Sequence, residues 1–158
     1  MRVFALALVL LMPITASATS LGLNAGAIEV VGLEDGVHYG VYPYAGLSLA
    51  LETEYALVIP GVGVEWAPEF GRWGFVGTLV ADFPVLDWLG ADVLLTFIHD
   101  QHNNEWSEAL YYFGLGGGVT FVFGQLTVSP SVSVFAPLNG SGWSFVPGLN
   151  VGYSLPIE

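Results

Sequence analysis

The feature that most constrains this chain is the regular alternation of apolar residues with small or polar residues toward its C-terminus. In one segment the apolar positions are Leu126, Val128, Pro130, Val132, Val134 and Ala136. The positions between them hold Thr127, Ser129, Ser131, Ser133 and Phe135. Successive side chains of a β-strand point to opposite faces, so this pattern predicts a strand with one apolar face and one small, polar face. Residues 111–123 and 143–155 repeat the pattern, and residues 58–66, 73–82 and 89–98 follow it more loosely.

The composition indicates that the apolar faces meet lipid. Apolar residues make up 54% of the chain and charged residues 10%, whereas soluble domains carry about 25% charged residues. No segment after residue 18 approaches the ~20 apolar residues that a membrane helix requires. A closed barrel satisfies all backbone hydrogen bonds between strands, which makes it the alternative to helices in lipid. We therefore expect an all-β fold, an up-and-down antiparallel transmembrane β-barrel of about eight strands.

The connections between the expected strands differ at the two ends. Short turns are expected at residues 51–55, 82–88 and 123–125. The opposite ends hold residues 34–36, 67–72, 99–108 and 138–142, of which 99–108 is the longest loop. Barrels of this class have short periplasmic turns and longer external loops, so we expect both termini on the periplasmic side. Aromatic residues cluster near both ends: Trp66, Trp73, Trp106 and Trp143 at the loop end, and Phe83, Trp88, Phe123 and Tyr153 at the turn end.

The first two strands, about 21–33 and 37–51, are less regular. By alternation Glu29 falls on the same apolar face as Leu21 and Leu23, where a charged side chain does not fit. We therefore expect either a bulge near Ala27 or a strand that leaves the bilayer early. Four prolines also fall within expected strands, where each removes a hydrogen-bond donor from a barrel without free edges: Pro43, Pro60, Pro130 and Pro147.

The N-terminus has the pattern of a secretory signal peptide. Arg2 precedes the apolar run Val3–Met12, and Ala16-Ser17-Ala18 fits the cleavage site. We expect a signal peptide at 1–18 and one barrel domain at 19–158. Removal of this segment takes away Arg2, lowers the formal net charge from −12 to −13 and leaves Arg72 as the only Lys or Arg, a balance that excludes nucleic acid as a partner. The chain has no Cys, so no disulfide stabilises it despite export.

At the level of pattern the chain resembles the small outer-membrane β-barrel proteins of Gram-negative bacteria. The resemblance covers the signal peptide and Ser20 to Ile157. It implies an outer-membrane location, contact with outer-membrane lipid, and insertion by the barrel assembly machinery. These families usually end in an aromatic residue, whereas this chain ends in Glu158 and Tyr153 is the nearest candidate.

Three carboxylates fall on the predicted luminal face within strands: Glu65, Asp82 and Asp92. A buried unpaired carboxylate is costly. Arg72, near the outer end of its strand, is the one available basic partner. The carboxylates therefore either lie at hydrated strand ends, form a cation-attracting lumen or narrow pore, or act as a proton-transfer pair. The glycines of 114–118 follow a strand pattern and are interpreted as backbone room inside the barrel.

The expected loop at 99–108 concentrates possible metal ligands. His99, Asp100, His102 and Glu105 are weak candidates, since their spacing matches no fixed motif and a solvated polar loop would contain such residues anyway. We therefore expect no metal site, no cofactor and no catalytic residue.

The leading function is a non-enzymatic structural or surface-interaction barrel. The alternatives are a small cation-attracting pore or ligand-binding barrel, a lipid-modifying outer-membrane enzyme, and a soluble periplasmic β-sandwich. The chain is similar to lipid A deacylase barrels in size and in its Tyr-Ser-Leu-Pro-Ile ending. Those enzymes use a His followed two positions on by a Ser, with an acid. Here Gly40, Gln101 and Asn104 occupy that second position after His38, His99 and His102, so no catalytic residue carries over.

Overall fold

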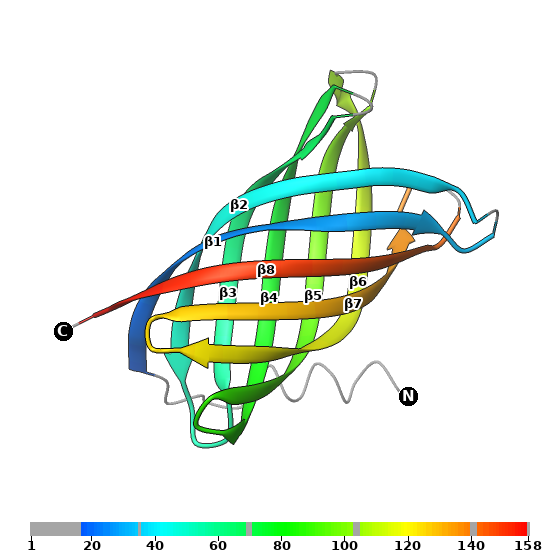
Figure 1. Cartoon of the computed structure of the whole chain (residues 1–158). Coiled ribbons are helices and arrows are strands. Elements are labelled where there is room, and N and C mark those ends of the chain that lie inside the picture. The colour runs from blue at the N-terminus through cyan, green and yellow to red at the C-terminus, as the bar shows by residue number, and fades with distance from the viewer. Residues whose placement is uncertain (1–16, 35, 69–70, 103–104, 140–141, 158) are drawn as a thin grey trace, which may run out of the picture.

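The computed structural model is a closed barrel of eight antiparallel strands (Figure 1). The structure describes residues 17–34, 36–68, 71–102, 105–139 and 142–157, with the side chains of 17, 101, 102 and 105–109 excepted. The strands are β1 (Ser17–Gly32), β2 (His38–Glu52), β3 (Leu57–Ala67), β4 (Arg72–Leu86), β5 (Leu89–His102), β6 (Glu105–Phe123), β7 (Leu126–Pro137) and β8 (Ser144–Pro156). Each strand pairs with the next along the chain, and β8 pairs with β1. The predicted fold class is confirmed.

The strands are strongly tilted. Paired positions followed around the barrel from Gly22 are Ser48, Gly61, Thr78, Thr96, Gly114, Phe135 and Ser144. The circuit returns to β1 at Gly32, ten residues beyond Gly22. Such an offset requires a strand tilt of roughly 35–45° to the barrel axis. In Figure 1 the strands at the front accordingly cross those at the back at a steep angle.

The alternation read from the sequence separates the two faces of the barrel. Large apolar side chains stand exposed on the outer face along every strand, with Val62 on β3 at 69% exposure and Leu115 on β6 at 56%. The intervening residues, such as Thr127 and Ser129 on β7, line the interior. The apolar face is therefore the outer one, as a barrel in lipid requires.

The aromatic residues lie near the ends where the sequence places them: Trp73 and Trp143 are exposed at the loop end, and Trp88 and Phe123 are exposed at the turn end. Two of the expected connections are wrong in extent. The turn expected at 82–88 is mostly strand, because β4 continues to Leu86 and β5 begins at Leu89. The loop expected at 99–108 is also mostly strand, because β5 continues to His102 and β6 begins at Glu105. The two strands form a hairpin that projects beyond the rest of the barrel in Figure 1. The side chain of Trp106 lies outside the described residues.

The bulge expected near Ala27 is wrong. The pairing of β1 with β2 keeps one register from Ser20 to Val30 and shifts between Val30 and Val31, and also between Ala18 and Ser20. Glu29 lies on the outer side of the strand at its loop end, where its Oε1 is 3.0 Å from Nδ1 of His38. Both side chains are exposed. The carboxylate of Glu29 therefore lies on the outer face of the strand, beyond the part of that face that is apolar.

The prolines lie where the hydrogen-bonded ladders are interrupted. The pairing of β2 with β3 skips Pro60, that of β6 with β7 skips Pro130, and that of β1 with β8 skips Pro147. Pro43 lies just beyond the last pair of β2 with β3. Because proline has no N–H to donate, these gaps remove the conflict between the four residues and a closed barrel.

Luminal glycines make room for the larger side chain opposite them. Gly114 pairs with Phe135, whose ring occupies the space that a Cβ atom on Gly114 would need. In the same way Gly74 lies under the carboxylate of Glu65, with 2.7 Å between the position of an added Cβ and Oε1. The interpretation of the glycines in β6 as backbone room is confirmed at Gly114.

This pairing predicts that Gly114→Ala destabilises the barrel. The added methyl group overlaps the Phe135 ring, and overpacking of this kind costs about 1–3 kcal/mol. Gly77→Ala is the matched control, because the nearest atom to its added Cβ is 3.9 Å away. Urea unfolding in lipid vesicles measures both; equal stabilities of the two variants would contradict the packing argument.

Candidate functional site: a divided lumen

The lumen contains two cavities. The turn-end cavity, of about 330 Å³, is lined mainly by small, polar and aliphatic side chains, including Asn24, Ser48 and Thr120. The loop-end cavity, of about 390 Å³, is lined by charged and aromatic residues that include Arg72, Asp100 and Tyr112. The interior is therefore chemically different at its two ends.

An apolar layer lies between the two cavities. Ile98, Phe135 and Val146 are buried and in contact, and Ile28, Val30, Val76 and Tyr112 pack against them. Ile28, Ile98 and Phe135 line both cavities, as does Glu65. These apolar side chains, with Glu65 beside them, therefore lie between the two cavities, as expected for a barrel of this size, whose interior is occupied by side chains.

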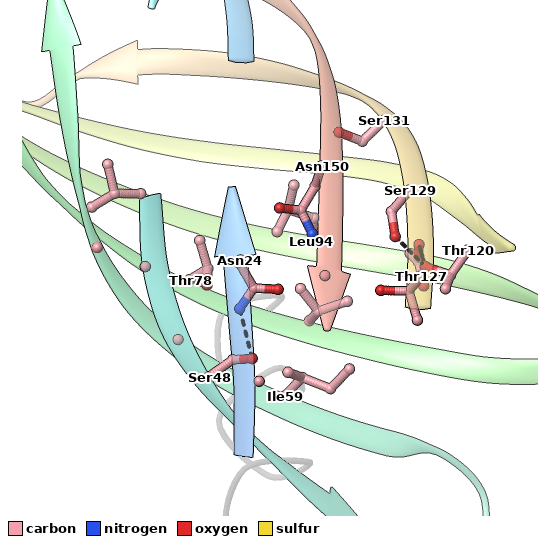
Figure 2. A pocket seen from close by; sticks show the side chains of 18 of the residues that line it. Asn24, Ser48, Ile59, Thr78, Leu94, Thr120, Thr127, Ser129, Ser131 and Asn150 are labelled. Atoms are coloured by element: carbon pink, nitrogen blue, oxygen red, sulfur yellow. Dashed lines mark hydrogen bonds between the residues drawn. The ribbon is translucent and has the colours of Figure 1, made fainter. Parts of the chain in front are cut away.

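The turn-end cavity contains a set of luminal hydrogen bonds (Figure 2). Asn24 Nδ2 donates to Ser48 Oγ at 2.8 Å. Thr120 Oγ1 is 2.8 Å from Asp92 Oδ2 and 2.7 Å from Ser129 Oγ. These bonds join β1 to β2, and β5 to β6 and β7, and they satisfy polar groups that would be costly if left alone.

The carboxylates Asp82 and Asp92 lie together in the turn-end cavity. They are directly opposite each other in the pairing of β4 with β5. The Asp82 side chain extends over Gly90, where an added Cβ would overlap it. Among the described residues the cavity lining holds no Arg or Lys, so these two acids form a local concentration of negative charge.

The loop-end cavity contains a cluster of three charged groups. Nη2 of Arg72 is 3.3 Å from Oδ2 of Asp100, and both side chains are largely buried. The neighbouring Glu65 is 3% exposed, and its Oε2 has no hydrogen-bond partner among the residues that the structure describes. Glu65, Arg72 and Asp100 all line this cavity. One basic group thus serves two buried carboxylates.

The three acids expected on the luminal face do not form one cluster. The structure places Asp82 and Asp92 opposite each other in the turn-end cavity, whereas Glu65 lines both cavities and shares the loop-end cavity with Arg72. The sequence analysis names Asp100 only as a candidate metal ligand in the expected loop and misses its luminal position, and it does not place Arg72 inside the barrel. The alternation that places Asp92 and Ile98 on the luminal face places Asp100 there as well, and this signal could have identified Asp100 as luminal.

The four candidate metal ligands do not form one described site. The ring of His99 stacks on Tyr111 of the outer face with 4.8 Å between centroids, whereas Asp100 points into the lumen. The side chains of His102 and Glu105 lie outside the described residues, although their backbones pair. Within the described part of the chain no group of three or more His, Asp or Glu side chains is placed to hold a metal ion.

Comparison with known proteins places the fold among small transmembrane barrels. No family model and no curated protein matches the chain. A de novo designed transmembrane β-barrel matches with a TM-score of 0.59 and 14% identity, over 88% of this chain and 98% of its own. The N-terminal β-barrel domain of Pseudomonas aeruginosa OprF matches with a TM-score of 0.55 and 14% identity, over 87% and 99%. Neisserial surface protein A matches with a TM-score of 0.52 and 11% identity, over 89% and 99%.

These similarities establish the architecture, and they agree with the pattern-level resemblance to small outer-membrane barrels. In the described ranges no helix is both long and apolar enough to cross a bilayer.

The charged cluster predicts a strong dependence of stability on Arg72. Arg72→Met leaves the buried carboxylates of Asp100 and Glu65 without their basic neighbour, and losing one partner of a buried ion pair costs about 3–5 kcal/mol. The double variant Arg72→Met, Asp100→Asn is expected to recover most of that loss. Urea unfolding of the single and double variants measures the coupling; strictly additive effects would argue against the ion pair.

Proposed function

We propose that this protein is an outer-membrane barrel with a non-enzymatic role, structural or in surface interactions, and with its loop end outside the cell. The apolar outer face supports placement in a membrane, and the expected signal peptide supports export. The short connections after β2, β4 and β6 support a periplasmic position for the turn end, which both β1 and β8 also reach.

The observation that carries this proposal is the apolar layer across the lumen. An ion that crossed the barrel would have to pass Ile98, Phe135 and Val146, which are buried against one another. Desolvating an ion among such side chains is highly unfavourable. The layer therefore favours a closed barrel over the alternative of a cation-attracting pore, although the carboxylates at both ends would attract cations.

Two further observations favour interaction over catalysis. The described histidines, His38 and His99, lie on the outer side of the barrel, apart from the hydrogen-bonded hydroxyls of Thr120 and Ser129 in the lumen. The hairpin of β5 and β6 extends beyond the barrel at the loop end, where a surface partner would meet it (Figure 1). Neisserial surface protein A, by its name a surface protein, has the same architecture.

A conductance measurement tests the closed lumen. We expect wild-type protein in planar bilayers to show no stepwise ion current, and the variant Ile98→Ala, Phe135→Ala to conduct because the apolar layer is opened. A cation-selective wild-type current that falls on Asp92→Asn would replace this proposal with the pore. A change in lipid A mass on expression of the protein would replace it with an enzyme.

The membrane-facing surface is tested by a charged substitution. Val62→Arg places a charge on the outer face of β3, which costs about 2–4 kcal/mol at the bilayer midplane. Tyr55→Arg is the control, because Tyr55 is 76% exposed but lies in the turn after β2. Stability in lipid vesicles is expected to fall for the first variant alone. Equal tolerance of both would contradict a lipid-facing β3.

A further inference from the structure

The loop-end cavity has the chemical composition of a binding site. Its described lining includes the carboxylates of Glu34, Glu65 and Asp100 against the single guanidinium of Arg72. Its volume of about 390 Å³ falls within the range of roughly 300–1,000 Å³ typical of small-molecule pockets. An acidic concave site of this kind attracts cations.

Glu65 is a buried carboxyl group of this cavity with one oxygen that no described residue pairs with. Its side chain is 3% exposed, and Oε2 has no hydrogen bond within the described residues. Arg72 forms its ion pair with Asp100, so the positive charge near Glu65 is already shared. A buried carboxylate in this state is stabilised by an added positive charge.

Aromatic rings complete the cavity. Tyr39, Tyr42, Tyr112 and Trp143 all line it. Aromatic faces bind ammonium groups through the negative electrostatic potential of the ring, and quaternary ammonium ligands are the best-known example. A carboxylate beside several aromatic rings therefore suits an organic cation better than a bare metal ion, which prefers several oxygen ligands.

We propose that the loop-end cavity binds a small organic cation through its ammonium group, with Glu65 as counter-ion and the aromatic rings as walls. This site goes beyond the proposed function and does not depend on it, since it requires only the closed barrel and its cavity. The turn-end cavity, with Asp82 and Asp92, is not part of it.

Gly74 gives a way to test the position of the carboxylate without changing its charge. Glu65 lies over Gly74, so Gly74→Ala inserts a methyl group 2.7 Å from the present position of Oε1 and must move it. The backbone of Gly74 is not in the left-handed region, and alanine is therefore compatible with the strand. Glu65→Gln removes the charge while keeping the shape, and Glu65→Asp restores the charge at a shorter reach.

The experiment is a titration of the full chain in a non-ionic detergent with choline chloride, followed by calorimetry. Its neutral isostere 3,3-dimethylbutan-1-ol and calcium chloride are titrated in parallel. We expect choline to bind wild-type protein at least about tenfold more tightly than the isostere, as one favourable charge interaction implies. Glu65→Gln is expected to lose about tenfold or more in choline affinity, with partial recovery in Glu65→Asp and a reduction in Gly74→Ala. Asp82→Asn, in the other cavity, is expected to bind as wild type.

Three results would overturn the proposal: no choline binding by wild-type protein, equal binding of the neutral isostere, or unchanged affinity in Glu65→Gln. Binding of calcium in place of choline would overturn the organic-cation class. Circular dichroism and the gel shift between heated and unheated samples verify that each variant is folded. If Glu65→Gln does not fold, the comparison of choline with its isostere on wild-type protein and the Gly74→Ala variant still decide the question. None of these readouts depends on conductance or on membrane location, so failure of the proposed function is distinguishable from failure of this site.

Discussion

Closure of the hydrogen-bonded ladder is the constraint on which the rest of this structure depends. A strand surrounded by lipid has no water to satisfy its backbone, so each strand needs a neighbour on both sides. The ladder closes when β8 pairs with β1 at an offset of ten residues, from Gly22 to Gly32. The offset fixes the tilt, and the tilt fixes which side chains meet inside. Prolines are tolerated because they coincide with gaps in the ladder.

The interior follows from this geometry and from the distribution of side-chain size. A barrel of eight strands is narrow, and a large luminal side chain fits where the opposing position is glycine, as with Phe135 over Gly114 and Glu65 over Gly74. Phe135 then reaches Ile98 and Val146 and forms the apolar layer. Pairing of a large side chain with an opposing glycine therefore accounts both for the apolar layer in the middle of the lumen and for the buried carboxyl group of Glu65 beside it.

Much of the fold was predictable from the sequence, because alternation with a period of two is a local signal and closure follows from the lack of membrane helices. Local signals failed where a strand continues through polar residues. The polar segment from His99 to Glu108 is predicted to be a loop but mostly belongs to β5 and β6. For this reason Asp100 was not recognised as a luminal residue. The bulge expected near Ala27 also failed, because pairing with β2 sets the register. Of the candidate site, the parity of Glu65, Asp82 and Asp92 was readable. The separation of Glu65 from Asp82 and Asp92 along the lumen depends on tilt and cross-strand packing, which one sequence does not encode locally.

The seam between β1 and β8 joins the two ends of the chain, with Ser20 opposite Pro156. No turn connects β1 directly to β8. Prolines also interrupt the ladders between β2 and β3 and between β6 and β7, but there a turn joins the two strands. The seam also lacks pairing beside Pro147. This ladder is therefore held by strand pairing alone, and it can form only when β8, the last strand of the barrel, is present. A barrel of this design stays an open sheet with two bare edges until that strand is in place.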